Sequence, residues 1–395
     1  MTNVLDSFQR YVHPSGLAVA TICAPHVRKI RYNLGIGVGS SVENGGEFGV
    51  AHFLEHVIGT SLEVELGLNV YAETTHTETS FSGRVPADKF SDLLTSIGRN
   101  LCLPSFDPDI LNTERSRILR EDFENPDEPE DHLEGLVPGN LIRHILGDSE
   151  FVSNVTEKEI IEFRDRTYGL SGITLGIVSP TPIDSQIVAN KLVYACSFVN
   201  DYTSFEPGIL ARQLDTDIRM SAPIDEYADL AIVRFFAANM TKPEDEPAEA
   251  ILDALLEQYI FAELSHKAGA IYAVESDMQV KGPITILSYG VNVDNDRVDL
   301  ARRAILGACE RLVNGKIPGD VFERAREGVI DQTDDITYNP GQLALWAKTC
   351  AKINFTPNEY VSSVAMATTA DVARNASKAL PPNNKVHRIF SLSYE

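Results

Sequence analysis

Two histidines and a glutamate near position 50 are the residues of this chain best suited to chemistry. His52 and His56 are four positions apart, so on a helix both side chains project from one face and can bind one metal ion. Zinc is the usual occupant of such a pair. Glu55 precedes the second histidine in the order H-x-x-E-H, within reach of water beside the metal. The motif therefore predicts zinc-dependent hydrolysis with Glu55 as the general base.

A catalytic zinc ion needs a third protein ligand, and a later segment offers two carboxylates. Residues 113–121 have a helical composition, and Glu114 and Glu121 are seven positions apart, on one face of that helix. We expect Glu121 to be the third ligand and Glu114 to hold a ligating histidine in its tautomer. The alternative interpretation is a helix with two exposed histidines and an ion-paired glutamate. The largely apolar sequence around the motif argues against it, because polar side chains inside an apolar helix need partners.

These two stretches resemble the signatures of a known protein family. Residues 45–60, GGEFGVAHFLEHVIGT, look like the signature of the pitrilysin family, the inverzincins, and the Glu114–Glu121 pair resembles the second signature. The family includes the mitochondrial processing peptidase, insulin-degrading enzyme and small bacterial processing peptidases. The resemblance is strong through residue 180 and weaker afterwards, as in a short, single-half bacterial member.

The length of the chain and the resemblance together predict two domains. A chain of 395 residues with 43% hydrophobic content is long enough for two cored domains. The resemblance implies an α+β fold with two related domains, each an antiparallel-rich sheet with helices packed on it. We expect residues 1–205 to form the metal-binding catalytic domain and residues 206–395 a related domain without the motif. The proline-containing stretch 180–222 is expected to contain the linker.

Local patterns predict several elements that surround the motif. Thr156 and Glu159 form a capping box that starts a helix ending near residue 168. Further elements are expected from periodicity and turn signals. The expected strands are 17–22, 32–38, 172–178, 230–238, 271–280 and 284–293, and the expected helices are 87–101, 108–124, 247–265, 296–314 and 318–333.

The threonine-rich stretch 71–85 is predicted to be extended. The resemblance implies that it includes an edge strand beside the active site, to which a substrate peptide can add as another strand. His76 in this stretch is expected on the strand surface rather than at the metal. The spacer between His56 and Glu121 is shorter than in better-known relatives, with the deletion between residues 60 and 67.

The second half resembles a family segment in which an arginine and a tyrosine, seven positions apart, reach the substrate. Tyr272 matches that tyrosine, and we include it with Glu55 and Glu114 among the catalytic residues. The arginine position is occupied by Ser265, which cannot replace a planar guanidinium. We therefore expect either a changed contact or one supplied by another subunit.

Composition limits the partners and the compartment. The net charge of −23 argues against binding to nucleic acid or to anionic membranes. No apolar run reaches the length of a membrane span, and the N-terminus lacks the pattern of an export signal. Five scattered cysteines without a C-x-x-C pair suggest reduced thiols, and we predict a cytoplasmic protein.

The predicted function is a zinc-dependent endopeptidase with one zinc ion per chain. The family encloses substrates in a chamber of four such domains, so the resemblance implies a dimer that cleaves peptides or the leader of a precursor. We favour a heterodimer whose homologous partner carries the arginine–tyrosine pair over a homodimer. The alternatives are a non-catalytic core or scaffold subunit and a peptide-binding protein of the same fold.

Overall fold

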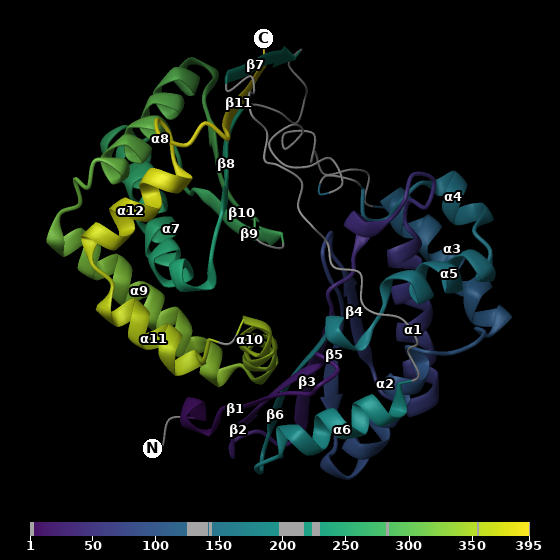
Figure 1. Cartoon of the computed structure of the whole chain (residues 1–395). Helices are drawn as coiled ribbons and strands as arrows, with labels where there is room; N and C mark the ends of the chain where they lie inside the picture. Colours follow the sequence, from purple (N-terminus) through teal and green to yellow (C-terminus); the bar gives the residue numbers. More distant parts are fainter. Residues whose placement is uncertain are drawn as a thin grey trace. The chain divides into compact units, whose positions relative to one another are not determined.

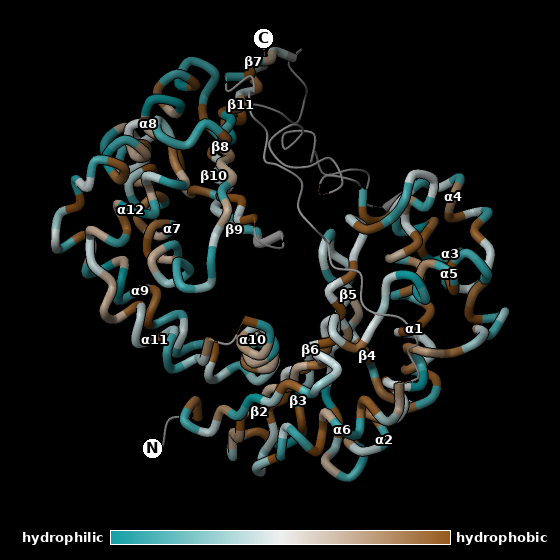
Figure 2. Tube along the Cα trace, in the orientation of Figure 1, coloured by the Kyte–Doolittle hydropathy of each residue, from teal (hydrophilic) through white to brown (hydrophobic). Residues whose placement is uncertain are grey.

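The computed structural model describes residues 4–124, 141, 144–196, 217–222, 230–281, 284–353 and 355–394. The chain divides into two compact units, each with its own sheet and hydrophobic core (Figures 1 and 2). Unit 1 comprises Met1–Glu130, Asn140–Glu206 and Asp334–Glu359, and the remaining residues form unit 2. This architecture confirms the predicted α+β class with two sheets that carry helices.

The sheet of unit 1 has six strands in the order β1-β2-β6-β3-β5-β4. Only β2 and β6 pair in parallel among these strands, and every other neighbouring pair is antiparallel. Strand β4 lies at one edge of the sheet, beside β5. The strands are β1 (Gln9–Val12), β2 (Ala18–Cys23), β3 (Ile30–Ile36), β4 (Val70–Thr74), β5 (Thr79–Val85) and β6 (Ile173–Ser179).

Helices cover both faces of this sheet, which explains its apolar central strand. Every residue of β6 is buried, because a strand covered on two faces needs apolar or small residues throughout. Helix α10 contacts β6, β3 and β2, on the face opposite to α1 and α2 (Figure 1). The helices of unit 1 are α1 (Val50–Leu66), α2 (Phe90–Asn100), α3 (Pro108–Glu124), α4 (Ser149–Asn154), α5 (Glu157–Thr167), α6 (Ser185–Ala195) and α10 (Pro340–Ile353).

Unit 2 repeats the topology of unit 1. Its sheet order, β7-β11-β8-β10-β9, equals that of unit 1 without β1, and its parallel pair again joins the first strand to the last. The strands are β7 (Asp217–Ala222), β8 (Ala231–Met240), β9 (Glu275–Lys281), β10 (Ile284–Val293) and β11 (His387–Tyr394). The second half is therefore related to the first in strand order, as the sequence analysis expected.

The helices in and around unit 2 are α7 (Glu246–Phe261), α8 (Val298–Val313), α9 (Gly319–Tyr338), α11 (Pro357–Met366) and α12 (Thr369–Ala379). Helices α7, α8 and α12 pack against one another, and α8 and α12 also pack against β8. A π-helical segment, Ala262–Lys267, follows α7 directly. Across the part of the chain that the structure describes, no helix is both long and apolar enough to cross a bilayer.

The predicted elements match the observed ones closely, with some omissions. Helix α3 has the expected bounds, and the capping box of α5 is formed by both of its hydrogen bonds. Strand β9 begins four residues later than expected, at Glu275. The sequence analysis did not anticipate α4, α6, α10, α11, α12, β7 or β11.

The division into units differs from a simple split between the two halves. The boundary predicted between residues 205 and 206 lies outside the described residues and stays a prediction. Residues 334–359, which the sequence analysis assigned to the C-terminal domain, cluster with the N-terminal residues instead. The reason is that α10 packs on the sheet of unit 1 and covers its second face.

A substitution in β6 tests this packing. A Cβ atom at Gly176 would lie 2.0 Å from the carbonyl oxygen of Ala344 in α10, so helix or strand must shift. We expect Gly176→Ala to lower the free energy of unfolding by roughly 1–3 kcal/mol. Gly328→Ala in α9 is the matched control, because its Cβ meets nothing within 4 Å and alanine favours a helix. If thermal denaturation gives both variants the same stability, the close packing of α10 on β6 is contradicted.

Candidate metal centre

Helix α1 begins after a glycine with a left-handed backbone conformation, and a buried carboxylate binds its first N–H groups. Gly49 precedes the helix with φ of 97°, which favours glycine. Both oxygens of Glu43 accept from the Gly49 N–H at 3.2 Å, and one also accepts from the Ala51 N–H at 2.9 Å. A carboxylate at a helix N-terminus satisfies donors that lack partners within the helix. The first turn, which carries His52, is therefore fixed.

Three predicted metal ligands converge at one point between α1 and α3. The Nε2 atoms of His52 and His56 are 3.0 Å apart. An oxygen of Glu121 lies 3.8 Å from the first of these nitrogens and 3.5 Å from the second. Among the described residues, these three form the group of donor atoms that could hold a metal ion. The structure thus brings together side chains 69 positions apart in sequence (121 − 52).

Glu114 fixes which nitrogen of His56 carries a proton. Its carboxylate is almost fully buried and lies 3.0 Å from Nδ1 of His56. The same carboxylate accepts hydrogen bonds from the Thr60 hydroxyl at 2.9 Å and from Arg117 at 2.7 Å. Because an ionised carboxylate only accepts, Nδ1 is the protonated nitrogen of a neutral His56. Its Nε2 lone pair therefore points at His52 and Glu121.

This arrangement fits a cation. A lone pair on His56 and a carboxylate oxygen of Glu121 face each other, and two acceptors do not stabilise each other without a positive charge between them. In a tetrahedral zinc site with bonds of about 2.0–2.1 Å, two ligand atoms lie roughly 3.3 Å apart. This is close to the separations between the nitrogen and oxygen atoms of His52, His56 and Glu121. The other ring nitrogen of His52, Nδ1, is buried and has no hydrogen-bond partner in the described structure. The residues present therefore suit a zinc ion, with the nitrogen of His52 less firmly oriented than that of His56.

Glu55 lies beside this cluster and is also buried. One of its oxygens is 3.8 Å from Nε2 of His52 and accepts a hydrogen bond from the Thr74 hydroxyl at 3.3 Å. Burial raises the pKa of Glu55 to about 7, and burial lowers the pKa of His52 to about 3. Burial disfavours the charged form of each group, so His52 is neutral in the folded chain, the form that binds metal ions.

The remaining predicted residues lie elsewhere. Tyr272 belongs to unit 2 and its side chain is fully exposed, so its part in the reaction stays a prediction. Ser265 lies in the π-helical segment of the same unit. The expectation that His76 is on a strand surface is wrong. It is buried in the turn between β4 and β5, where the Ser41 N–H donates to its carbonyl oxygen.

Two contacts at the centre were not predicted from the sequence. Thr74 was noted only as part of an extended stretch, yet its hydroxyl contacts Glu55. Glu43 was not singled out, although it caps the helix that carries both histidines. The partners lie 19 and 8 positions away in sequence, so no helical or strand periodicity links them.

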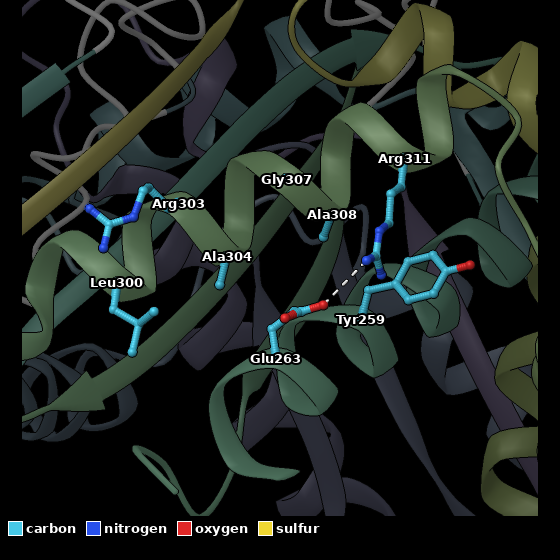
Figure 3. Close-up of a pocket in the computed structure, with 8 residues that line it drawn as sticks. All are labelled: Tyr259, Glu263, Leu300, Arg303, Ala304, Gly307, Ala308 and Arg311. Atoms are coloured by element: carbon cyan, nitrogen blue, oxygen red, sulfur yellow. Dashed lines mark ion pairs between the residues drawn. The ribbon is translucent and has the colours of Figure 1, made fainter. Parts of the chain in front are cut away.

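A separate hollow of about 220 Å³ lies in unit 2 (Figure 3). Its floor is made by small residues of α8, and Arg303 and Arg311 stand on either side. The Arg311 guanidinium lies 5.5 Å from the centre of the Tyr259 ring and 3.4 Å from the Glu263 carboxylate. The hollow contains none of the residues of the metal centre.

Comparisons with known proteins agree with this fold. The model of the family "Insulinase (Peptidase family M16)" matches residues 18–149. A relative named "Uncharacterized zinc protease" from Rickettsia felis is 26% identical over 213 residues, which is 49% of this chain and 51% of that protein. The match thus spans about half the length of that relative.

Solved structures resemble the whole chain. A protease from Helicobacter pylori has a TM-score of 0.79 at 15% identity, with 98% of this chain and 99% of that chain covered. The M16 peptidase inactive domain from Pseudomonas fluorescens has a TM-score of 0.80 at 13% identity, with 98% of both chains covered. At such identities, these likenesses establish the fold alone.

The fold and the site define an α+β protein of two units, with a cluster of two histidines and a glutamate in unit 1. The chain therefore resembles the insulinase-type peptidase family, M16, in sequence over residues 18–149 and in its overall fold.

The contact between Glu114 and His56 gives a test of the metal centre. Glu114→Gln keeps the shape of the side chain and removes the charge that holds the Nδ1 proton, so we expect zinc affinity to fall about 10–100-fold. Competition with a chromogenic chelator measures this change. Glu150→Gln on the exposed surface of α4 is the control and should bind zinc like the wild type. Equal affinity in both variants would rule out the orienting role of Glu114.

Proposed function

We propose that the chain is a zinc-dependent endopeptidase that cleaves peptides or the leader of a precursor protein. The observation that carries the proposal is the convergence of His52, His56 and Glu121, with Glu55 buried beside them. Two imidazoles and one carboxylate leave one position of a tetrahedral zinc ion open, as catalysis requires. Two relatives from Rickettsia are named zinc proteases, which also supports the proposal.

Each side chain then has a defined role in peptide hydrolysis. His52, His56 and Glu121 would hold one zinc ion, and Glu114 keeps His56 in its binding tautomer. A bound zinc ion acidifies water and polarises the carbonyl of a peptide bond. Glu55 accepts the proton of the attacking water and returns it to the leaving amine.

Edge strand β4 offers a place for the substrate backbone. It pairs with β5 on one side, and its other edge has no neighbouring strand among the described residues. Tyr71 on this strand is 68% exposed, and Thr74 at its end contacts Glu55. An extended peptide that pairs with β4 would be held by main-chain hydrogen bonds and delivered to the general base. Such binding selects an extended chain with little regard for its side chains.

Replacement of the general base tests the reaction. We expect Glu55→Gln to bind zinc as the wild type does and to cleave peptides at least about 10²-fold more slowly, because the amide cannot accept the proton. Metal analysis and mass spectrometry of peptide digests measure the two properties. Cleavage at the wild-type rate would show that Glu55 is not the base.

A non-catalytic scaffold subunit or a peptide-binding protein is the second candidate function. The similarity of the fold to an M16 domain described as inactive favours it. The presence of the complete set His52, Glu55, His56, Glu114 and Glu121 argues against it, since a scaffold does not need them. Zinc binding without any cleavage in the wild type would favour this second function.

We further propose that the chamber is formed by a dimer in the cytoplasm, without membrane or nucleic acid partners. Each chain supplies two units of related topology, and four such units would enclose a substrate. Because Ser265 cannot supply a guanidinium, a heterodimer with a homologous subunit that carries an arginine–tyrosine pair is favoured over a homodimer. None of the five cysteines forms a disulfide in the structure, which suits a reducing compartment.

The oligomeric state can be measured directly. We expect light scattering of the purified chain to give the mass of a monomer or an inactive dimer, and activity to appear on addition of a homologous subunit with the arginine–tyrosine pair. If the chain alone forms an active homodimer, the proposal of a heterodimer is wrong, whereas the proposal of a chamber formed by two chains still holds.

A further inference from the structure

A lysine from the C-terminal half is buried against the sheet of the metal-binding unit. Lys348 lies in α10 and is only 5% exposed. Its ammonium group forms an ion pair with the Glu78 carboxylate, in the turn between β4 and β5. Both residues belong to unit 1, although 270 positions separate them. A buried lysine is uncommon and is normally retained for its partner.

Two glycines of the sheet make room for this ion pair. A Cβ atom at Gly35 in β3 would lie 2.5 Å from a carboxylate oxygen of Glu78 and 3.1 Å from the Cδ atom of Lys348. A Cβ atom at Gly176 in β6 would lie 2.4 Å from the Lys348 backbone nitrogen. Neither glycine has a left-handed backbone, so each is explained by the close approach of α10 and its lysine.

Glu78 also closes the turn that joins the edge strand to β5. The Thr75 N–H donates to the carbonyl oxygen of Glu78 at 2.8 Å, and the Glu78 N–H donates to the Thr75 hydroxyl at 3.0 Å. On its other side, the turn accepts hydrogen bonds from the Ser40 and Ser41 N–H groups, which precede the motif helix. The side chain of Lys348 therefore contacts a turn that hydrogen bonds also join to the segment before the motif helix.

The turn is directly connected to the general base. Thr74 is the last residue of β4 and precedes the turn, and its hydroxyl donates to the buried carboxylate of Glu55. A displacement of the turn would move this hydroxyl and the end of the strand proposed to bind the substrate. The path from Lys348 to Glu55 consists of one ion pair, one closed turn and one hydrogen bond.

We propose that Lys348 and Glu78 are positioning residues for peptide hydrolysis, an inference that rests on the proposed function. Their ion pair fixes the β4–β5 turn, and through Thr74 it sets the orientation of the Glu55 carboxylate. A buried ion pair contributes little net stability, because desolvation offsets the attraction, but it defines how two elements meet. Helix α10 thus makes the C-terminal half a part of the catalytic unit, even with Ser265 in place of the usual arginine.

The first experiment compares catalysis with stability in zinc-loaded full-length variants. We expect Lys348→Met and the double variant Lys348→Met/Glu78→Gln to retain zinc and to lower kcat about tenfold or more, since small misplacements of catalytic groups are costly. Lys348→Arg keeps the charge and should stay within a few-fold of the wild type. Arg302→Met is the matched control, because Arg302 is equally buried in unit 2 and pairs with Asp217.

The control separates positioning from a merely structural effect. Arg302→Met should lower the melting temperature and leave kcat unchanged at a temperature well below unfolding. If the two Lys348→Met variants behave in the same way, with a lower melting temperature and a wild-type kcat, the positioning role is overturned. A kcat of Lys348→Arg as low as that of Lys348→Met would also contradict a role for the charge.

A second readout does not depend on activity. Hydrogen exchange of the metal-free chain should show faster exchange at the Thr75 and Glu78 amides in Lys348→Met, and unchanged exchange there in Arg302→Met. Unchanged exchange in Lys348→Met would overturn the proposed ion-pair role, whatever the activity. If the zinc-loaded wild type cleaves no peptide, the proposed function fails. The exchange rates then show by themselves whether the ion pair fixes the β4–β5 turn.

Discussion

The candidate metal centre depends on one electrostatic constraint, which is the convergence of groups that can all offer electron pairs to the same point. Glu114 holds the proton of His56 on the far side of the ring, so the near nitrogen has only a lone pair to present. That lone pair faces a carboxylate oxygen of Glu121 and the ring of His52. A cation between these groups would attract all three, and the packing of α1 against α3 holds them close together.

The two units share one architecture, yet among the described residues the candidate site is found in unit 1. Both sheets share the same strand order, and both carry a helix after the third strand of that order. In unit 1 this helix is α1 with its two histidines, whereas its counterpart after β8 is α7, which contains none. The shared topology is therefore a scaffold, and the chemistry follows from the residues placed on one copy of it.

Unit 1 is nevertheless not confined to the first half of the chain. Helix α10 covers the sheet face opposite to α1 and removes the central strand β6 from solvent. Edge strand β4, the Glu55 carboxylate and this helix are then linked by side chains that lie far apart in sequence. The packing of unit 1 therefore depends on a helix from the second half of the chain.

The sequence alone determined the local elements and the identity of the chemical groups. The spacing of His52 and His56 on a helix, the two glutamates on a second helix and the capping box at Thr156 are short-range patterns, and helix geometry converts each into a position. The sequence could not reveal that Thr74 contacts Glu55, that Glu43 caps α1 or that His76 is buried. Nor could it place α10, because an amphipathic helix shows that it packs but not on which sheet. Those contacts were decided by tertiary structure, since they depend on how strands and helices distant in sequence share one core.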